Sequence, residues 1–150
     1  MLLVIDNTED DRGVFYAEMD NKFVQGVLKR TAASSKQKTS GHNIRSKAFK
    51  TKQSDDLLVC LDKFLSELNL SVKDITCVGV VMGVGRFTGT RLAVTLANTL
   101  AYGLRIPVIK LEKNFDRRAA SAKAKEAKAG QYVMPEYSAE AHIQGKNNQV

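Results

Sequence analysis

Short apolar runs separated by polar turns fill the beginning of the chain and predict β-strands there. One run covers residues 2–5, a second covers 13–19 and a third covers 23–28, with Asp20-Asn21 as a turn between the last two. Strands that follow one another through short turns pair antiparallel. The pattern therefore predicts three sequential antiparallel strands.

Leucine and phenylalanine then recur at helical spacing over residues 54–68, with Ser54 suited to the N-cap. Asn69 ends this helix. The apolar run that follows, residues 75–82, lacks polar alternation, which is typical of a central parallel strand covered on both faces. The middle of the chain therefore predicts a helix followed by a buried strand.

A second helix is predicted over residues 88–102, where leucines and alanines form two rows with a spacing of four residues. Gly103 ends it, and a strand over 106–111 follows. Residues 114–129 are rich in Ala, Lys and Arg and have only a thin apolar face, which predicts a solvated helix. This order of elements predicts a compact α/β domain, a mixed sheet covered by helices.

The net charge of +7 is concentrated in one segment, residues 30–53 and their immediate neighbour Lys29. From Lys29 to Gln53 there are eight basic residues and no acidic one, among serines, threonines and few large apolar residues. This composition predicts a flexible, solvated loop. Its charge serves either solubility or the attraction of a phosphate backbone, and the sequence leaves both open.

The length of 150 residues fits one domain. No apolar stretch approaches the length of a bilayer span and no leader pattern opens the chain, so we expect a cytoplasmic protein without membrane contact. Cys60 and Cys77 lack CxxC spacing, which predicts two reduced, buried thiols. His42 and His142 belong to no metal-ligand motif, and no metal site is expected.

Three closely spaced glycines follow the run 75–82 and open the second helix. Gly83, Gly85 and Gly89 lie at offsets of two and then four positions, whereas the dinucleotide fingerprint needs offsets of two and then three, and no Gly-Lys-Ser/Thr follows. A glycine loop before a helix still offers free N–H groups to an anion or to a partner's polar group. The turn itself needs neither Arg86 nor Arg91, so both are candidates for function.

The loop and its surroundings resemble the TsaB family, also called YeaZ, bacterial partners in making threonylcarbamoyl-adenosine in tRNA. The family's loop usually reads G-P-G-S-F-T-G-L-R, and residues 83–91 match it at six of nine positions. The opening Ile5-Asp6-Asn7-Thr8 is similar to the family's I-D-T, and the chain through Ile106-Pro107 is similar to its A-x-G-L-A-x-x-L-x-I-P. The resemblance covers roughly the first three quarters of the chain.

This resemblance implies an actin/Hsp70-like, or ribonuclease H-like, single lobe over residues 1–112. Its five-stranded mixed sheet would combine three antiparallel strands with parallel ones. Family members typically carry a second, smaller domain, and here residues 113–150, a Lys- and Ala-rich helix with a short extended tail, stand in its place. The resemblance also implies no catalytic residue of its own, since the related TsaD subunit carries the metal site and the transfer reaction.

The first hypothesis for function is a non-catalytic partner that stabilises a TsaD-like subunit in a heterodimer, with a TsaE-like ATPase as a further partner. A homodimer is the alternative. The interface would lie on the two amphipathic helices, although burial in the core is the simpler interpretation for any single residue. The interface candidates are Leu57, Leu61, Phe64, Leu68, Arg91, Ala93, Ala97 and Ala101.

The second hypothesis is an actin-like nucleotide-binding enzyme, in which Asp6, Asn7 and Thr8 form a phosphate loop at a strand end. The glycine loop would face it with Gly83, Gly85, Arg86, Phe87, Thr88 and Gly89. Because one lobe does not enclose a nucleotide, any ATP, ADP or threonylcarbamoyl-adenylate would be shared at the partner interface.

The third hypothesis is a basic module that binds tRNA. It would use the basic segment 30–53 and the Lys-rich helix near the end of the chain. The cations of that helix are Arg117, Arg118, Lys123, Lys125 and Lys128.

Overall fold

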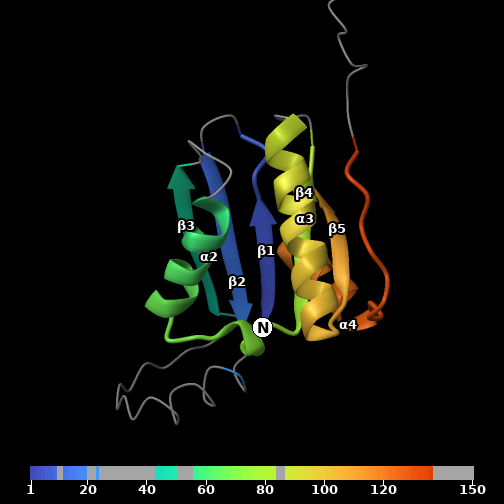
Figure 1. The fold of residues 1–150 in the computed structure, drawn as a ribbon. Coiled ribbons are helices and arrows are strands. Elements are labelled where there is room, and N and C mark those ends of the chain that lie inside the picture. Colours follow the sequence, from blue (N-terminus) through green and yellow to red (C-terminus); the bar gives the residue numbers. More distant parts are fainter. Residues whose placement is uncertain (10–11, 20–22, 24–42, 51–55, 84–86, 137–150) are drawn as a thin grey trace, which may run out of the picture.

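The computed structural model describes residues 1–9, 12–19, 23, 43–50, 56–83 and 87–136. Within these residues the chain forms a five-stranded sheet with the order β3-β2-β1-β4-β5 (Figure 1). The strands are β1 (Leu2–Asp6), β2 (Arg12–Met19), β3 (Asn43–Lys50), β4 (Cys77–Met82) and β5 (Val108–Glu112).

Strand directions confirm the predicted mixed sheet. β1 pairs antiparallel with β2, and β2 pairs antiparallel with β3. On its other side β1 pairs parallel with β4, which pairs parallel with β5. All six residues of β4 are buried, in keeping with their continuous apolar run.

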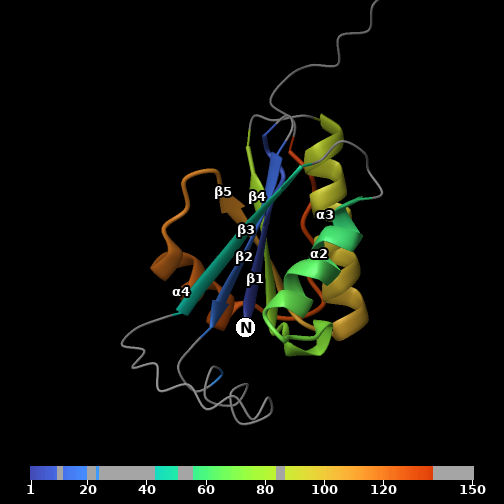
Figure 2. The ribbon, with the colours of Figure 1, turned by 90° about the vertical axis from the view of Figure 1, so that its left-hand side faces the viewer.

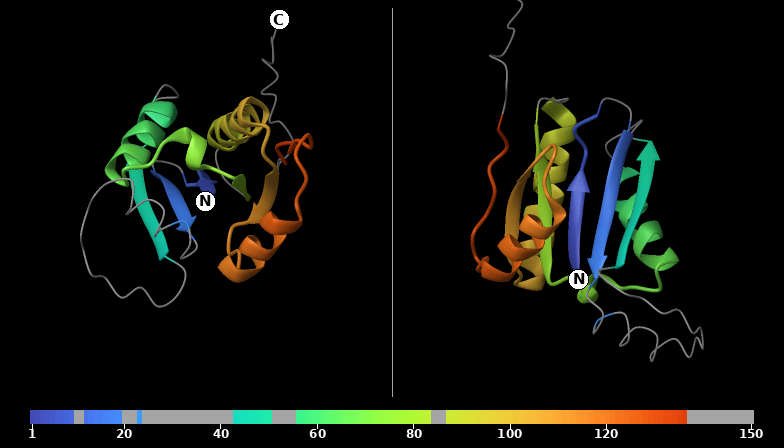
Figure 3. Two further views of the ribbon diagram at one scale, coloured as in Figure 1. Left: turned by 90° about the horizontal axis from the view of Figure 1, so that it is seen from below. Right: turned by 180° about the vertical axis from the view of Figure 1, so that it is seen from behind.

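Helices cover both faces of the sheet. Figures 2 and 3 show α2 (Asp56–Glu67) and α3 (Phe87–Leu104) on one face and α4 (Arg117–Glu126) on the opposite face. A short 3-10 helix, η1 (Val72–Asp74), lies between α2 and β4. The larger core lies beneath α2 and α3, where the rings of Phe15 and Phe64 stack with centroids 5.7 Å apart.

The third strand is where the sequence interpretation was wrong. It was predicted over residues 23–28, but Phe23 is helical and 24–28 lie outside the described residues. The strand is β3, inside the segment predicted as a flexible basic loop. An edge strand tolerates lysine and arginine because one side and much of its surface face water, and Lys47 forms an ion pair with Glu67 at the end of α2.

The ends of the two long helices follow one geometry with different residues. Asn69 has a φ of 54° after α2, and Arg105 has a φ of 55° after α3. The Arg105 N–H donates to the Tyr102 carbonyl at 3.3 Å and the Ile106 N–H donates to the Ala101 carbonyl at 3.0 Å, which is a Schellman ending. The prediction that Gly103 ends α3 is therefore wrong, because the left-handed position belongs to Arg105.

α4 is shorter than the predicted helix over 114–129 and is only partly solvated. Asp116 caps it, with its Oδ1 accepting from the Ala119 N–H at 2.9 Å. Ala120 is buried in a second core with residues of β1, β4 and β5. Small alanine side chains thus let a cationic helix lie on the sheet while its charges stay in water.

None of the helices in the described part of the chain combines the length and apolar character that a bilayer crossing requires. The thiols of Cys60 and Cys77 are both free. Cys77 is buried in β4, whereas Cys60 is half-buried in α2. Burial raises the pKa of the Cys77 thiol from 9.0 to about 11.

Candidate functional site

The end of β1 and the glycine loop, two segments that sequence analysis singled out, meet at the carboxyl edge of the sheet. A Cβ built on Gly83 would lie 3.7 Å from the Thr8 methyl carbon. A Cβ built on Gly89 would lie 2.8 Å from the Asn7 carbonyl oxygen, closer than a real Cβ can approach. Glycine at position 89 therefore permits the start of α3 to contact the end of β1.

Asp6 has a local structural partner in this arrangement. Its Oδ1 accepts from the Thr8 N–H at 3.1 Å and from the Thr8 hydroxyl at 2.8 Å. This is an Asx turn, the common use of an aspartate at a strand end. Asp6 and Thr8 thus shape the turn that carries Asn7 toward α3.

Asn7 is the buried polar residue at the centre of the contact. Its side chain is 3% exposed, and its Nδ2 donates to the Gly89 carbonyl at 3.1 Å. Among the residues that the structure describes, none donates a hydrogen bond to its buried Oδ1. A buried acceptor without a donor costs free energy, so this atom is suited to accept from a hydroxyl or amino group of a ligand.

The rest of the predicted loop is only partly described. Gly85 and Arg86 lie outside the described residues, as does Val84. Phe87 begins α3, Thr88 is exposed in its first turn, and Arg91 is exposed one turn further on. Among the residues that the structure describes, no three His, Cys, Asp or Glu side chains gather where they could hold a metal ion.

The interface predicted on the two helices needs correction. Six of its eight residues are buried between the helices and the sheet, and their side chains are unavailable to a partner. Leu68 is half-buried against the same core, and Arg91 alone among the eight is exposed. The six buried residues are Leu57, Leu61, Phe64, Ala93, Ala97 and Ala101.

The apolar surface of these helices lies instead on the outer side of α2. Leu58 is 63% exposed and Val59 is 50% exposed. They border a groove of about 430 Å³, called here the α2 groove, with Leu61 and Leu65 buried within it. The groove is lined by Leu58, Val59, Leu61, Asp62, Leu65, Val72 and Leu100.

A sequence signal for this groove was present. Leu57, Leu58 and Val59 are consecutive, and consecutive residues on a helix point in different directions. One core-facing stripe cannot take all three. The excess predicts a second apolar face, which the sequence interpretation had missed.

The cations proposed for tRNA binding are divided between local contacts and open surface. The Arg117 guanidinium lies 6.0 Å from the centre of the Tyr16 ring, and Lys123 Nζ donates to the Lys110 carbonyl at 2.8 Å. Arg118, Lys125 and Lys128 are exposed. Much of the basic segment 30–53 lies outside the described residues.

Comparison with known proteins gives a family and a fold. The family model described as "TsaD: tRNA N6-adenosine threonylcarbamoyltransferase" matches residues 27–126. A search of curated proteins returned no match. Among solved structures, YeaZ from Pseudomonas aeruginosa superposes with a TM-score of 0.52 at 17% identity.

The superposition with YeaZ covers 74% of this chain and 43% of that one. A second structure, of an uncharacterized protein with similarity to peptidase YeaZ from P. aeruginosa, gives the same TM-score and identity over 74% and 42% of the two chains. The chain thus spans less than half the length of these structures. Their likeness confirms the expected YeaZ-type α/β fold.

Proposed function

The chain belongs to the family described as TsaD, tRNA N6-adenosine threonylcarbamoyltransferase, and we propose that it acts in tRNA threonylcarbamoylation. We propose further that it does so as a non-catalytic subunit. In this role it pairs with a TsaD-like subunit and stabilises it, and a TsaE-like ATPase is a further partner. The observation that carries the proposal is the α2 groove.

The α2 groove has the properties of an interface anchor. Leu58 and Val59 form an exposed apolar rim beside buried leucines, and Asp62 is the one charged residue among the described lining residues. Binding energy concentrates where apolar side chains fill such pockets at the centre of an interface. A helix of the partner that lays its apolar face into the groove would bury this rim.

Charge favours a different chain over a second copy as the occupant. Each copy carries a net charge of +7, so two copies repel one another at long range. A partner whose surface carries negative charge would be attracted by the same field. We therefore propose a TsaD-like subunit as the occupant of the α2 groove, and self-association through the groove would contradict this pairing.

A binding experiment with two glutamate variants tests the pairing. Leu58→Glu places a charge at the groove, whereas Ser66→Glu adds the same charge at an exposed position of α2 outside it. With the TsaD-like subunit of the same organism at micromolar concentration, wild type and Ser66→Glu should form a complex. Leu58→Glu should weaken it at least tenfold.

Absence of a wild-type complex would overturn the proposal, as would a Leu58→Glu chain that binds like wild type. A wild-type homodimer that Leu58→Glu dissociates would assign the groove to a second copy instead. Circular dichroism of both variants checks that the helices remain intact.

A second candidate function is nucleotide binding at the end of β1, favoured by Asn7 Oδ1, a buried acceptor to which no described residue donates. ATP, ADP or threonylcarbamoyl-adenylate would offer hydroxyl and amino donors to this acceptor. One lobe covers only one side of such a ligand, so we propose that the partner subunit completes the site. ADP should then raise the Tm of the complex more than that of either subunit alone, and equal shifts would contradict the shared site.

A further inference from the structure

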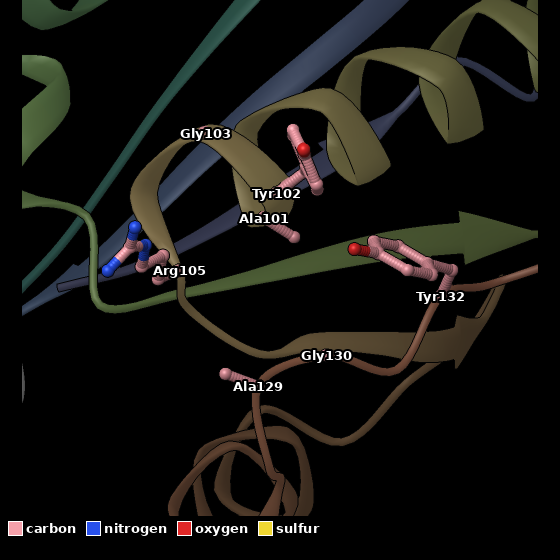
Figure 4. A pocket seen from close by; sticks show the side chains of 7 residues that line it. All are labelled: Ala101, Tyr102, Gly103, Arg105, Ala129, Gly130 and Tyr132. Carbon is pink, nitrogen blue, oxygen red and sulfur yellow. The ribbon is translucent and has the colours of Figure 1, made fainter.

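A second cavity lies at the opposite end of α3 from the glycine loop. It has a volume of about 610 Å³, within the range of small-molecule sites. Its walls are the last turn of α3 and the segment that follows α4 (Figure 4). The lining residues are Ala101, Tyr102, Gly103, Arg105, Ala129, Gly130 and Tyr132.

Two exposed tyrosines are the main feature of this cavity. Tyr102 projects from α3 and is 74% exposed, and Tyr132 projects from the segment after α4 and is 53% exposed. The space beside the rings is bordered by alanine and glycine, which leave room for a flat group. A Cβ on Gly103 or Gly130 would meet no atom within 4 Å.

Arg105 lines the same cavity with a positive charge, and none of the described lining residues is acidic. Its φ of 55° is a conformation that glycine adopts at lower cost. A glycine at position 105 would end the helix more easily but would remove the cation.

Two exposed aromatic rings and an arginine that line one cavity, with no carboxylate among the described lining residues, fit one unit of a nucleic acid strand. A base stacks on tyrosine, and the guanidinium pairs with a phosphate. Two lysines near the cavity would attract the neighbouring phosphates of the nucleic acid strand. Lys128 adjoins Ala129 in the chain, and Lys125 is exposed in the last turn of α4.

We propose that this cavity binds an unpaired nucleotide of RNA, with Tyr102 and Tyr132 both packing against the base and Arg105 holding a phosphate. The inference deepens the proposed role in tRNA modification and rests on it for the identity of the RNA. It assigns the RNA contact to the end of α3 rather than to the basic segment 30–53.

Direct binding of single-stranded decaadenylate to the isolated chain tests the cavity. Tyr102→Ala and Tyr132→Ala should each weaken binding about tenfold, and Tyr102→Phe should bind like wild type because it keeps the ring. The chain has four tyrosines and no tryptophan, so stacking should also quench its fluorescence, and Tyr102→Ala should quench less.

A negative charge on the cavity wall has a matched control on α2. Gly103→Glu should weaken RNA binding by repelling the phosphate, whereas Ser66→Glu, exposed on α2 and outside the cavity, should bind RNA like wild type. Arg105→Ala should lower the slope of log affinity against log salt by about 0.7, the value for one phosphate contact to a single strand.

No binding by the wild-type chain would overturn the inference, as would tyrosine variants that bind like wild type. These measurements need no partner subunit. If the tyrosine variants bind RNA like wild type while the complex with the TsaD-like subunit still forms, the RNA site is contradicted and the proposed pairing stands. If RNA binds at the tyrosines but no complex with the TsaD-like subunit forms, the proposed pairing is contradicted and the RNA site stands.

Discussion

The side chain of Asn98 clamps the backbone of Val133 through two hydrogen bonds. Asn98 Nδ2 donates to the Val133 carbonyl at 2.9 Å, and the Val133 N–H donates to Asn98 Oδ1 at 3.0 Å. This fixes the segment after α4 against the middle of α3, 35 residues away in the chain. Lys110 of β5 adds an ion pair with Glu136. The position of Tyr132, next to Val133, therefore depends on Asn98.

Asn98→Ala should lower the free energy of unfolding by about 1–2 kcal/mol, because two partly buried backbone groups lose their partners. Urea denaturation measures this loss. Thr99→Ala, an exposed neighbour on α3, is the control and should change stability by less than about 0.5 kcal/mol. Equal stability of the two variants would show that the clamp contributes nothing.

Two glycines of α3 should respond in opposite directions to alanine. Gly89→Ala forces a Cβ to within 2.8 Å of the Asn7 carbonyl oxygen and should destabilise the fold by about 1–3 kcal/mol. Gly103→Ala meets open space and should stabilise it by about 0.5–1 kcal/mol, since alanine favours a helix. Thermal unfolding of both variants measures the contrast, and the same sign for both would contradict the described contact.

Alanine variants of two leucines on α2 should distinguish a core side chain from one on the exposed rim of the α2 groove. Leu61→Ala removes a side chain that is buried in the core and should cost about 2–5 kcal/mol. Leu58→Ala truncates a largely exposed side chain, and the isolated chain should lose less than about 0.5 kcal/mol. Chemical denaturation gives both values. A large loss in Leu58→Ala would mean that the α2 groove is part of the core.

The raised pKa of Cys77 predicts a specific dependence on pH. At pH 9 the buried thiol is still protonated, because its pKa is about 11, so iodoacetamide should leave Cys77 unmodified in the folded chain. In urea both cysteines should react. Mass spectrometry of the alkylated peptides measures this, and rapid modification of folded Cys77 would contradict its burial.

The same shift links Cys77 to stability. Between pH 9 and 11 the folded state keeps a proton that the unfolded state releases, so this group's contribution is complete below pH 9 and falls as the pH rises toward 11. Cys77→Ala should reduce the alkaline loss of stability. An unchanged pH profile in this variant would assign the loss to other groups.

Most of the fold could be predicted from sequence because apolar periodicity reports directly on burial. The runs that became β1, β2 and β4 and the helical spacing of α2 and α3 were all interpreted correctly. β3 was missed because charge was taken as evidence for a loop, whereas pairing with β2 satisfies the backbone of a charged edge strand.

The candidate site shows a similar division. The resemblance of residues 83–91 located the glycine loop, and its contact with Asn7 could be expected from the topology. Most side chains of the predicted interface are buried, because helical spacing cannot tell a residue that faces the sheet from one that faces a partner. Leu57 is buried and the adjacent Leu58 is exposed, and only tertiary packing distinguishes the two leucines.

The Tm of the TsaD-like subunit, measured with and without this chain, tests the proposed pairing most directly. A subunit that binds the folded partner stabilises it by mass action, so saturating wild-type chain should raise that Tm by about 5 °C. Ser66→Glu should give the same rise and Leu58→Glu almost none. A Tm that is unchanged by the wild-type chain would contradict the stabilising pairing.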